Sequence, residues 1–128
     1  MKVTFKTKEI TEDLVKKFAN EQLLHQDFHL DINDTYLVFG LFIKNNGAVI
    51  IDCLNKYNHV HSYPLDLFEI EDGKVSKYWI MKVNKNGEIQ FSVKEFYDNI
   101  YFLDDLSEDI PEVVSQFQDL LKRMQNEI

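Results

Sequence analysis

The sequence is poor in the residues that build cross-linked or glycine-rich frameworks, with one cysteine, two prolines and four glycines among 128 residues. A single cysteine cannot form an internal disulfide, and Cys53 lies in the apolar run 49–54, so we expect a small buried side chain. The glycines, at 40, 47, 73 and 87, are too scattered for a phosphate-binding loop or a dinucleotide fingerprint. A disulfide scaffold and the common nucleotide-binding loops are therefore excluded.

Linear signatures of catalysis are also missing. The sequence has no Gly-x-Ser-x-Gly elbow, no Cys-x-x-Cys pair and no His-Glu-x-x-His helix. Segment 31–35 begins like a calcium loop, but Tyr36 stands at the sixth position, where glycine is needed, and Phe42 at the twelfth, where glutamate is needed. The sequence therefore predicts a protein that is not an enzyme and that binds no cofactor.

Long apolar segments are absent as well. No stretch approaches the roughly 18 apolar residues of a membrane-spanning helix, and the first residues lack the apolar core of a secretory signal. The pattern therefore predicts a cytoplasmic protein. With 128 residues, it is expected to form a single α+β domain over 1–128 that needs no covalent staple.

Charge is unevenly distributed. There are 14 basic and 22 acidic residues, a net charge of −8 that argues against nucleic acid and anionic membranes as partners. Region 95–121 holds eight of the acids and no lysine or arginine. A cationic protein partner is the natural complement of such a region, and the alternative is that the acids form a solvated face that only keeps the protein in solution.

Alternating apolar residues predict a largely antiparallel sheet. The runs Ser76–Val83 and Glu88–Val93 flank a connection that ends in Asn-Gly and predict a β-hairpin. Its first arm is apolar on both sides, which is typical of an inner strand. Further strands are expected at 2–6, 35–44, 48–54 and 57–63, with a bulge or a close backbone approach at Gly40.

Helices are predicted at both ends of the chain. Thr11 is a candidate N-cap of a helix that ends near Leu24, and a short helix is expected over 95–104. Asp109 and Glu112 suggest a capping box for a C-terminal helix with an apolar stripe. The fold class is therefore α+β: an antiparallel β-meander of about five to six strands with an N-terminal and a C-terminal helix packed on it.

The acidic region supplies the first candidate site. Tyrosine and phenylalanine side chains within it could anchor a protein interface that the carboxylates surround, or could belong to the core. The predicted partner-binding residues are Glu95, Tyr97, Asp98, Tyr101, Phe102, Asp104, Asp105 and Glu108. In general character the chain resembles small acidic immunity or antitoxin-type proteins, which neutralise cationic toxins, but no motif assigns it to a family.

Two alternatives remain open. The first is a ligand-binding or enzymatic domain with a pocket between sheet and helices, lined by Phe39, Trp79 and the histidine strand. In that case a metal site could be built from four imidazoles, those of His59, His61, His25 and His29. The second is a homodimer, because strands that are apolar on both faces must be covered by something.

Overall fold

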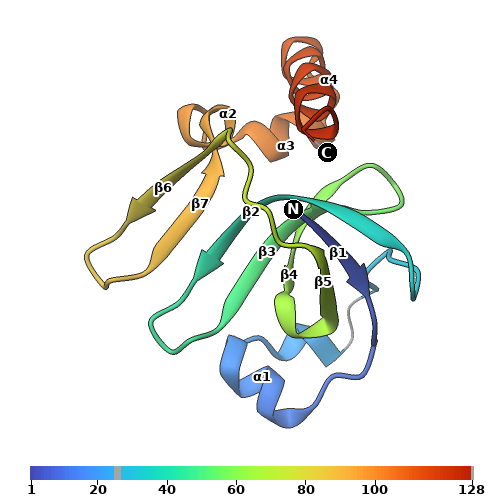
Figure 1. Cartoon of the computed structure of the whole chain (residues 1–128), viewed down its shortest axis with the longest axis vertical. Coiled ribbons are helices and arrows are strands. Elements are labelled where there is room, and N and C mark those ends of the chain that lie inside the picture. Colours follow the sequence, from blue (N-terminus) through green and yellow to red (C-terminus); the bar gives the residue numbers. More distant parts are fainter. Residues whose placement is uncertain (25–26, 128) are drawn as a thin grey trace.

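The computed structural model describes residues 1–24 and 27–127 and shows an α+β fold (Figure 1). Within these residues, seven strands and four α-helices are found, together with two 3₁₀ turns, η1 and η2. The strands are β1 (Lys2–Phe5), β2 (Thr35–Ile43), β3 (Val49–Leu54), β4 (Val60–Pro64), β5 (Phe68–Asp72), β6 (Trp79–Val83) and β7 (Ile89–Val93). The helical elements are α1 (Glu12–Phe18), η1 (Glu21–Leu24), η2 (Leu65–Leu67), α2 (Lys94–Asp98), α3 (Phe102–Ser107) and α4 (Pro111–Gln125).

Five of the strands form a sheet that curls on itself. Their order is β4-β3-β2-β1-β5, and every pairing is antiparallel. In a flat sheet the outer strands β4 and β5 would lie about 19 Å apart, at about 4.8 Å per strand spacing. The chain nevertheless crosses from one to the other through the three residues of η2. The two outer strands must therefore approach each other, so that the five strands enclose an interior.

The remaining two strands branch from β2. The first residues of β2 pair with β1, whereas Leu41–Ile43 pair with β7 on the same edge, and β7 pairs in turn with β6. The predicted irregularity at Gly40 is confirmed, because the register with β3 shifts between Val38 and Gly40. The close approach is confirmed too: a Cβ at Gly40 would lie 2.5 Å from the carbonyl oxygen of Phe91 in β7.

Two apolar clusters fill the molecule. The curled sheet encloses the first, which includes Val3, Phe5, Ile51 and Tyr63, and also holds Cys53, whose predicted burial is confirmed. Burial raises the pKa of the Cys53 thiol. The second cluster lies between the sheet and the helices α3 and α4, which Figure 1 shows together with α2 at one end of the molecule, opposite α1. Its large buried members include Phe39, Phe102, Phe117 and Met124.

The ends of the helices differ in part from the sequence predictions. Thr11 caps α1 as predicted, since its hydroxyl accepts a hydrogen bond from the Leu14 amide at 3.1 Å. However, α1 ends at Phe18 and not near Leu24, and its C-cap residue, Ala19, takes a left-handed backbone conformation. The predicted capping box of α4 is wrong, because Ile110 is the N-cap residue and forms no side-chain cap hydrogen bond. Pro111 does occupy the first turn, where its missing amide hydrogen costs nothing.

Two further predictions need correction. The sheet is not a simple meander, because β5 returns to pair with β1 and β7 pairs with β2 across the sequence. The first arm of the predicted hairpin, β6, is not an inner strand: within the described residues it pairs with β7 alone and forms an edge. None of the helices described over 1–24 and 27–127 has the length and apolar character needed to span a membrane.

Candidate functional site

The predicted aromatic anchors do not share one environment. Phe102 is only 1% exposed and packs against Phe96, with the ring centroids 5.2 Å apart. It is therefore a core residue that presents almost no surface to a partner in this structure. Tyr101, its neighbour in sequence, is 61% exposed. The alternation arises because α3 begins at Phe102 and turns that side chain toward α4, while Tyr101 lies just outside the helix.

Tyr97 holds the β6–β7 hairpin in place. Its hydroxyl lies 3.0 Å from the carbonyl oxygen of Ile80 and 3.3 Å from that of Gln90, and donates toward them. The Nζ atom of Lys82 lies 4.2 Å from the centre of the tyrosine ring, a cation–π contact. Burial raises the pKa of Tyr97. This side chain is thus committed to an internal contact and is only partly available to a partner.

The predicted acidic residues divide in the same way. Glu95 accepts a hydrogen bond from Arg123 at 2.8 Å, and Asp98 forms an ion pair with Lys94 of the same helix. Both carboxylates are therefore compensated locally. The side chains of Asp104 and Glu108 are exposed, and no lysine or arginine of the described residues lies within ion-pair distance of them. The acidic surface that is free to meet a partner is therefore centred on α3.

A groove runs beside α3 along the open edge of β4. In the described part of the chain, β4 pairs only with β3, so the backbone of its other edge is not part of a ladder. The groove has a volume of about 730 Å³. Its lining comes from three parts of the chain, η1 with the preceding residue, the strand β4 with the preceding residue, and α3; the residues are Asn20, Gln22, His59, Val60, His61, Ser62, Leu103, Asp104, Leu106 and Ser107.

The structure brings two of the predicted histidines into this groove. The rings of His59 and His61 have centroids 6.1 Å apart, and His29 packs instead against Tyr57 at 4.9 Å. His25 lies outside the described residues. No three histidine, cysteine, aspartate or glutamate side chains within 1–24 and 27–127 are arranged to hold a metal ion. The groove therefore offers imidazoles as hydrogen-bonding groups beside the carboxylate of Asp104.

The His61 imidazole gives a testable pH dependence. Partial burial lowers the pKa of His61, and the charges of His59 and His29 lower it further. A histidine whose pKa is lowered in the folded state binds its proton less readily there than in the unfolded state, so stability falls as the pH drops below about 6.5. We expect His61→Gln to reduce the loss of unfolding free energy between about pH 7.5 and about pH 5, measured by urea denaturation. An unchanged loss would contradict this expectation.

A hydrogen-bonded polar pair lies next to the groove. Ser62 of β4 stands opposite Asp52 of β3, and its hydroxyl donates a hydrogen bond of 2.6 Å to that carboxylate. Burial raises the pKa of Asp52, an effect that the Ser62 hydroxyl partly offsets. Ser62 is one of the residues that line the groove, so this bond orients one of the groove's polar groups. Sequence reasoning missed the pair because nothing local indicates which residues face each other across two strands.

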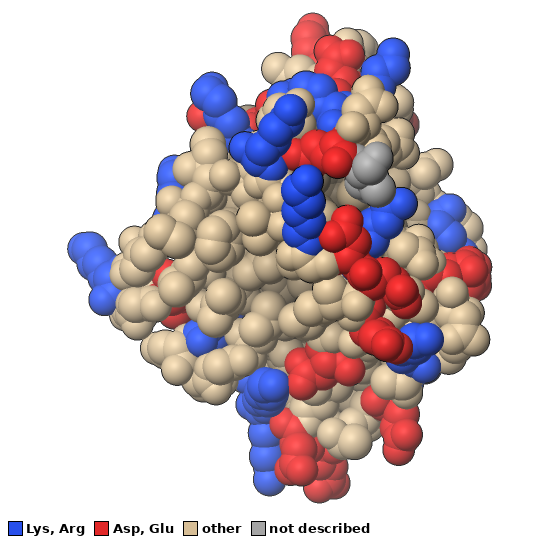
Figure 2. Space-filling view, viewed as in Figure 1, with Lys and Arg blue, Asp and Glu red and all other residues tan. Residues whose placement is uncertain are grey.

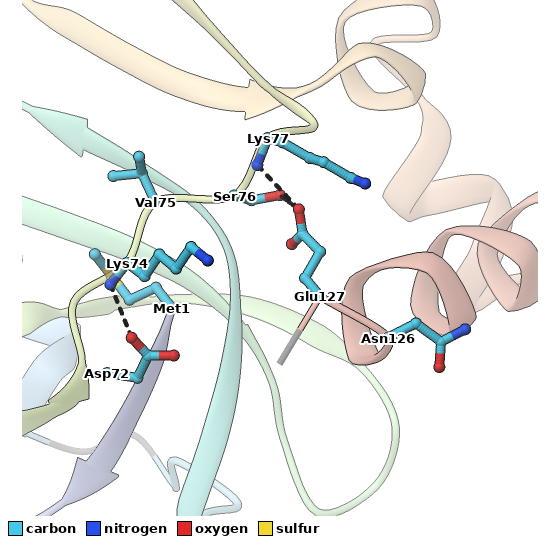
Figure 3. Close-up of a pocket in the computed structure, with 8 residues that line it drawn as sticks. All are labelled: Met1, Asp72, Lys74, Val75, Ser76, Lys77, Asn126 and Glu127. Atoms are coloured by element: carbon cyan, nitrogen blue, oxygen red, sulfur yellow. Dashed lines mark hydrogen bonds between the residues drawn. The ribbon is translucent and has the colours of Figure 1, made fainter.

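A second pocket, of about 400 Å³, lies between the β5–β6 connection and the end of α4 (Figure 3). Glu127 accepts hydrogen bonds of 2.9 Å from the Ser76 hydroxyl and from the Lys77 amide, while Asp72 accepts one from the Lys74 amide. Both carboxylates thus bind backbone amides, and Glu127 also binds the Ser76 hydroxyl; neither forms an ion pair with the lysine side chains that line the pocket. We interpret this arrangement as a clasp that fixes the start of β6 to the C-terminal helix.

The pocket predicted between sheet and helices is filled where Phe39 lies. Phe39 has no exposed surface and packs against Phe117 and Phe96, with centroids 5.5 and 6.3 Å away. Trp79 contacts both apolar clusters, and its indole nitrogen is buried without a hydrogen-bond partner in the described structure. The groove beside β4 is therefore the better candidate site.

Searches of protein-family models, curated proteins and solved structures found no match to this chain.

Proposed function

We propose that this protein is a protein-binding module that holds an extended, cationic segment of its partner in the groove between β4 and α3. The observation that carries the proposal is the position of Asp104 in the same groove as the unpaired edge of β4. The edge supplies backbone hydrogen-bonding groups, and α3 supplies negative charge. The strand edge would pair with the backbone of the ligand, and the negative charge would attract its cationic side chains.

The backbone of β4 favours an extended ligand. An exposed strand edge presents amide and carbonyl groups that an incoming segment can pair with, while pockets beside the edge select alternate side chains. Here the groove offers both kinds of lining, with Val60, Leu103 and Leu106 as apolar contacts and Asn20, Gln22 and Ser107 as polar ones. A strand added at this position would extend the β3–β4 pairing by one more ladder.

The charge of α3 favours a cationic ligand. Asp104 lines the groove, and Asp105 and Glu108 lie on the same short helix or just after it. No lysine or arginine lines the groove, and the chain as a whole carries a net charge of −8. Such a field accelerates the encounter with a positive segment, and its effect weakens as salt is added.

A short synthetic peptide tests this proposal. We expect a peptide of about six residues, alternating lysine and valine, to shift the amide NMR signals of His59–Ser62 and Leu103–Ser107. Asp104→Lys should weaken binding about tenfold, because it replaces an attraction by a repulsion of similar size. Asp119→Lys is the matched control, since Asp119 is an exposed acid of the same region that does not line the groove.

Two further comparisons separate the contributions. The same peptide with N-methylated alternate amides keeps its charge but cannot pair as a strand, so it should lose most of its affinity. An alternating glutamate and valine peptide should not bind the groove. Equal weakening by Asp104→Lys and Asp119→Lys, or shifts spread over all acidic surfaces, would show that only general charge attraction is at work.

A further inference from the structure

The β6–β7 hairpin presents an apolar surface that the chain leaves open. Ile80, Met81 and Val83 of β6 are 41%, 59% and 58% exposed. Met81 and Val83 lie on one face of the strand and Ile80 lies on the other, because successive side chains alternate. Figure 2 shows the surface over the β6–β7 and β2–β3 hairpins as broad, largely uncharged and hollowed toward its middle.

The exposed residues of β6 continue an apolar face across neighbouring strands. Residues paired in register point to the same side of a sheet, so the pairings define two rows. The first row consists of Val83, Ile89, Ile43 and Val49, and the second of Met81, Phe91, Leu41 and Ile51. Ile51 is fully buried in the first apolar cluster, whereas the residues toward β6 are increasingly exposed. Along these rows the side chains therefore change from buried in the core to exposed on this face.

The charge around this face is opposite to that of the rest of the chain. Segment 73–87 contains four lysines, Lys74, Lys77, Lys82 and Lys85, and no aspartate or glutamate. Among the described residues, no carboxylate lies within ion-pair distance of these four lysines. With a net charge of −8 for the chain, this segment is a local positive region in a negative molecule.

The hairpin is also held rigidly at its base. Glu127 fixes Ser76 and Lys77, the Trp79 amide donates to the Ser76 carbonyl at 3.2 Å, and the Tyr97 hydroxyl bridges the two arms. A strand edge that is already ordered loses little conformational entropy when a second strand pairs with it. The edge of β6 is therefore preorganised for an added strand.

From these observations we infer that β6 is a second docking edge, and that its occupant is an extended acidic segment of a partner protein. Apolar side chains of that segment would pack on Met81 and Val83, and acidic side chains on the opposite face would meet Lys82. A second copy of this chain fits less well, because two hairpins meeting edge to edge would oppose four lysines with four lysines. An anionic membrane would be repelled by the remainder of the chain and would leave the strand edge unpaired.

Trp79 makes the test specific, since it is the only tryptophan of the chain and lies at the start of β6. The probe is a peptide of about six residues that alternates glutamate and valine. We expect it to change the Trp79 fluorescence and the amide signals of Trp79–Val83. Lys82→Glu should weaken binding about tenfold, whereas Lys16→Glu, on the distant helix α1, should leave it unchanged.

Four results would overturn the inference. The first is that Lys82→Glu and Lys16→Glu weaken peptide binding equally, and the second is that an N-methylated acidic peptide binds as well as the unmodified one. The third is that the hairpin binds anionic phospholipid vesicles in place of the peptide. The fourth is self-association in sedimentation experiments that Lys82→Glu abolishes. The last result would show that β6 docks on a second copy, for example in its acidic groove. Binding at the groove beside β4 is tested with a cationic peptide and with the NMR signals of other residues. A negative result for β6 therefore leaves the proposed function standing.

Discussion

Replacing Gly40 by alanine is expected to lower the free energy of unfolding by about 3 kcal/mol, the upper part of the usual range for overpacking. The new Cβ would lie 2.5 Å from the carbonyl oxygen of Phe91 and 3.3 Å from the Cα of Ser92. Both are backbone atoms of β7, so no side-chain rotation can relieve the contact. For a chain of this size the melting temperature should fall by about 10 °C.

Gly73→Ala is the matched control for this substitution. A Cβ at Gly73 would meet only the Cγ2 atom of Ile70, at 3.6 Å, which is an ordinary contact. Its effect should stay within about 0.5 kcal/mol. Urea denaturation followed by Trp79 fluorescence and by circular dichroism measures both variants, and equal stability of the two would contradict the close packing of β2 and β7.

The effect of Gly40→Ala should also be local. The clash falls where β7 joins β2, whereas the curled five-stranded sheet has its own apolar cluster and its own pairings. Amide hydrogen exchange should therefore become faster across β6 and β7 than across β1 and β5. The acidic peptide should lose affinity for this variant, since β7 is the only strand with which β6 pairs in the described structure.

Most strands could be predicted from the sequence because their signal is local. Alternating apolar residues and Asn-Gly connections located β2, β3, β6 and β7 to within a few residues. The strand β5 was not among the expected strands, although Phe68 and Ile70 alternate with acidic residues. Its partner could not be foreseen either: Phe68 and Ile70 stand opposite Phe5 and Val3, more than 60 residues earlier in the sequence.

The position of β6 shows where local reasoning ends. Tyr78, Ile80 and Met81 make the strand apolar on both sides, which normally indicates burial on both faces. The structure instead places β6 at an edge, since the close approach at Gly40 lets β7 occupy the free half of β2 and leaves β6 outermost. A surplus of apolar surface on an edge strand is not a packing requirement of the monomer, and this is why it points to a partner.

The candidate site was predictable only in pieces. The acidic region and the histidine strand were singled out separately, and the structure brings Asp104 together with His59 and His61 in one groove. These residues are more than 40 positions apart in sequence, so only the packing of α3 beside β4 unites them. The carboxylate of Glu95 could not be separated from Asp104 beforehand, because its partner Arg123 lies on another helix. Asp98 pairs with Lys94 at the i,i+4 spacing of a single helix, which the sequence already contains.

Phe102→Ala is expected to be the most destabilising change in the acidic region, lowering the free energy of unfolding by about 3–5 kcal/mol. The side chain is 1% exposed and packs against Phe96, so its removal leaves a cavity beneath α3. Tyr101→Ala is the matched control, since this adjacent ring is 61% exposed, and it should change stability by no more than about 0.5 kcal/mol. Thermal and urea unfolding measure both.

The same substitution connects the core to the groove. Phe102 is the first residue of α3, and Leu103 and Asp104, which follow it, line the groove. A cavity under Phe102 should let α3 shift, so the cationic peptide should bind Phe102→Ala more weakly even at temperatures where the variant is folded. Phe102→Leu keeps most of the apolar volume and should recover most of the stability and of the binding. If Phe102→Ala were destabilised but bound the peptide as well as wild type, α3 would not be positioning the acidic wall of the groove.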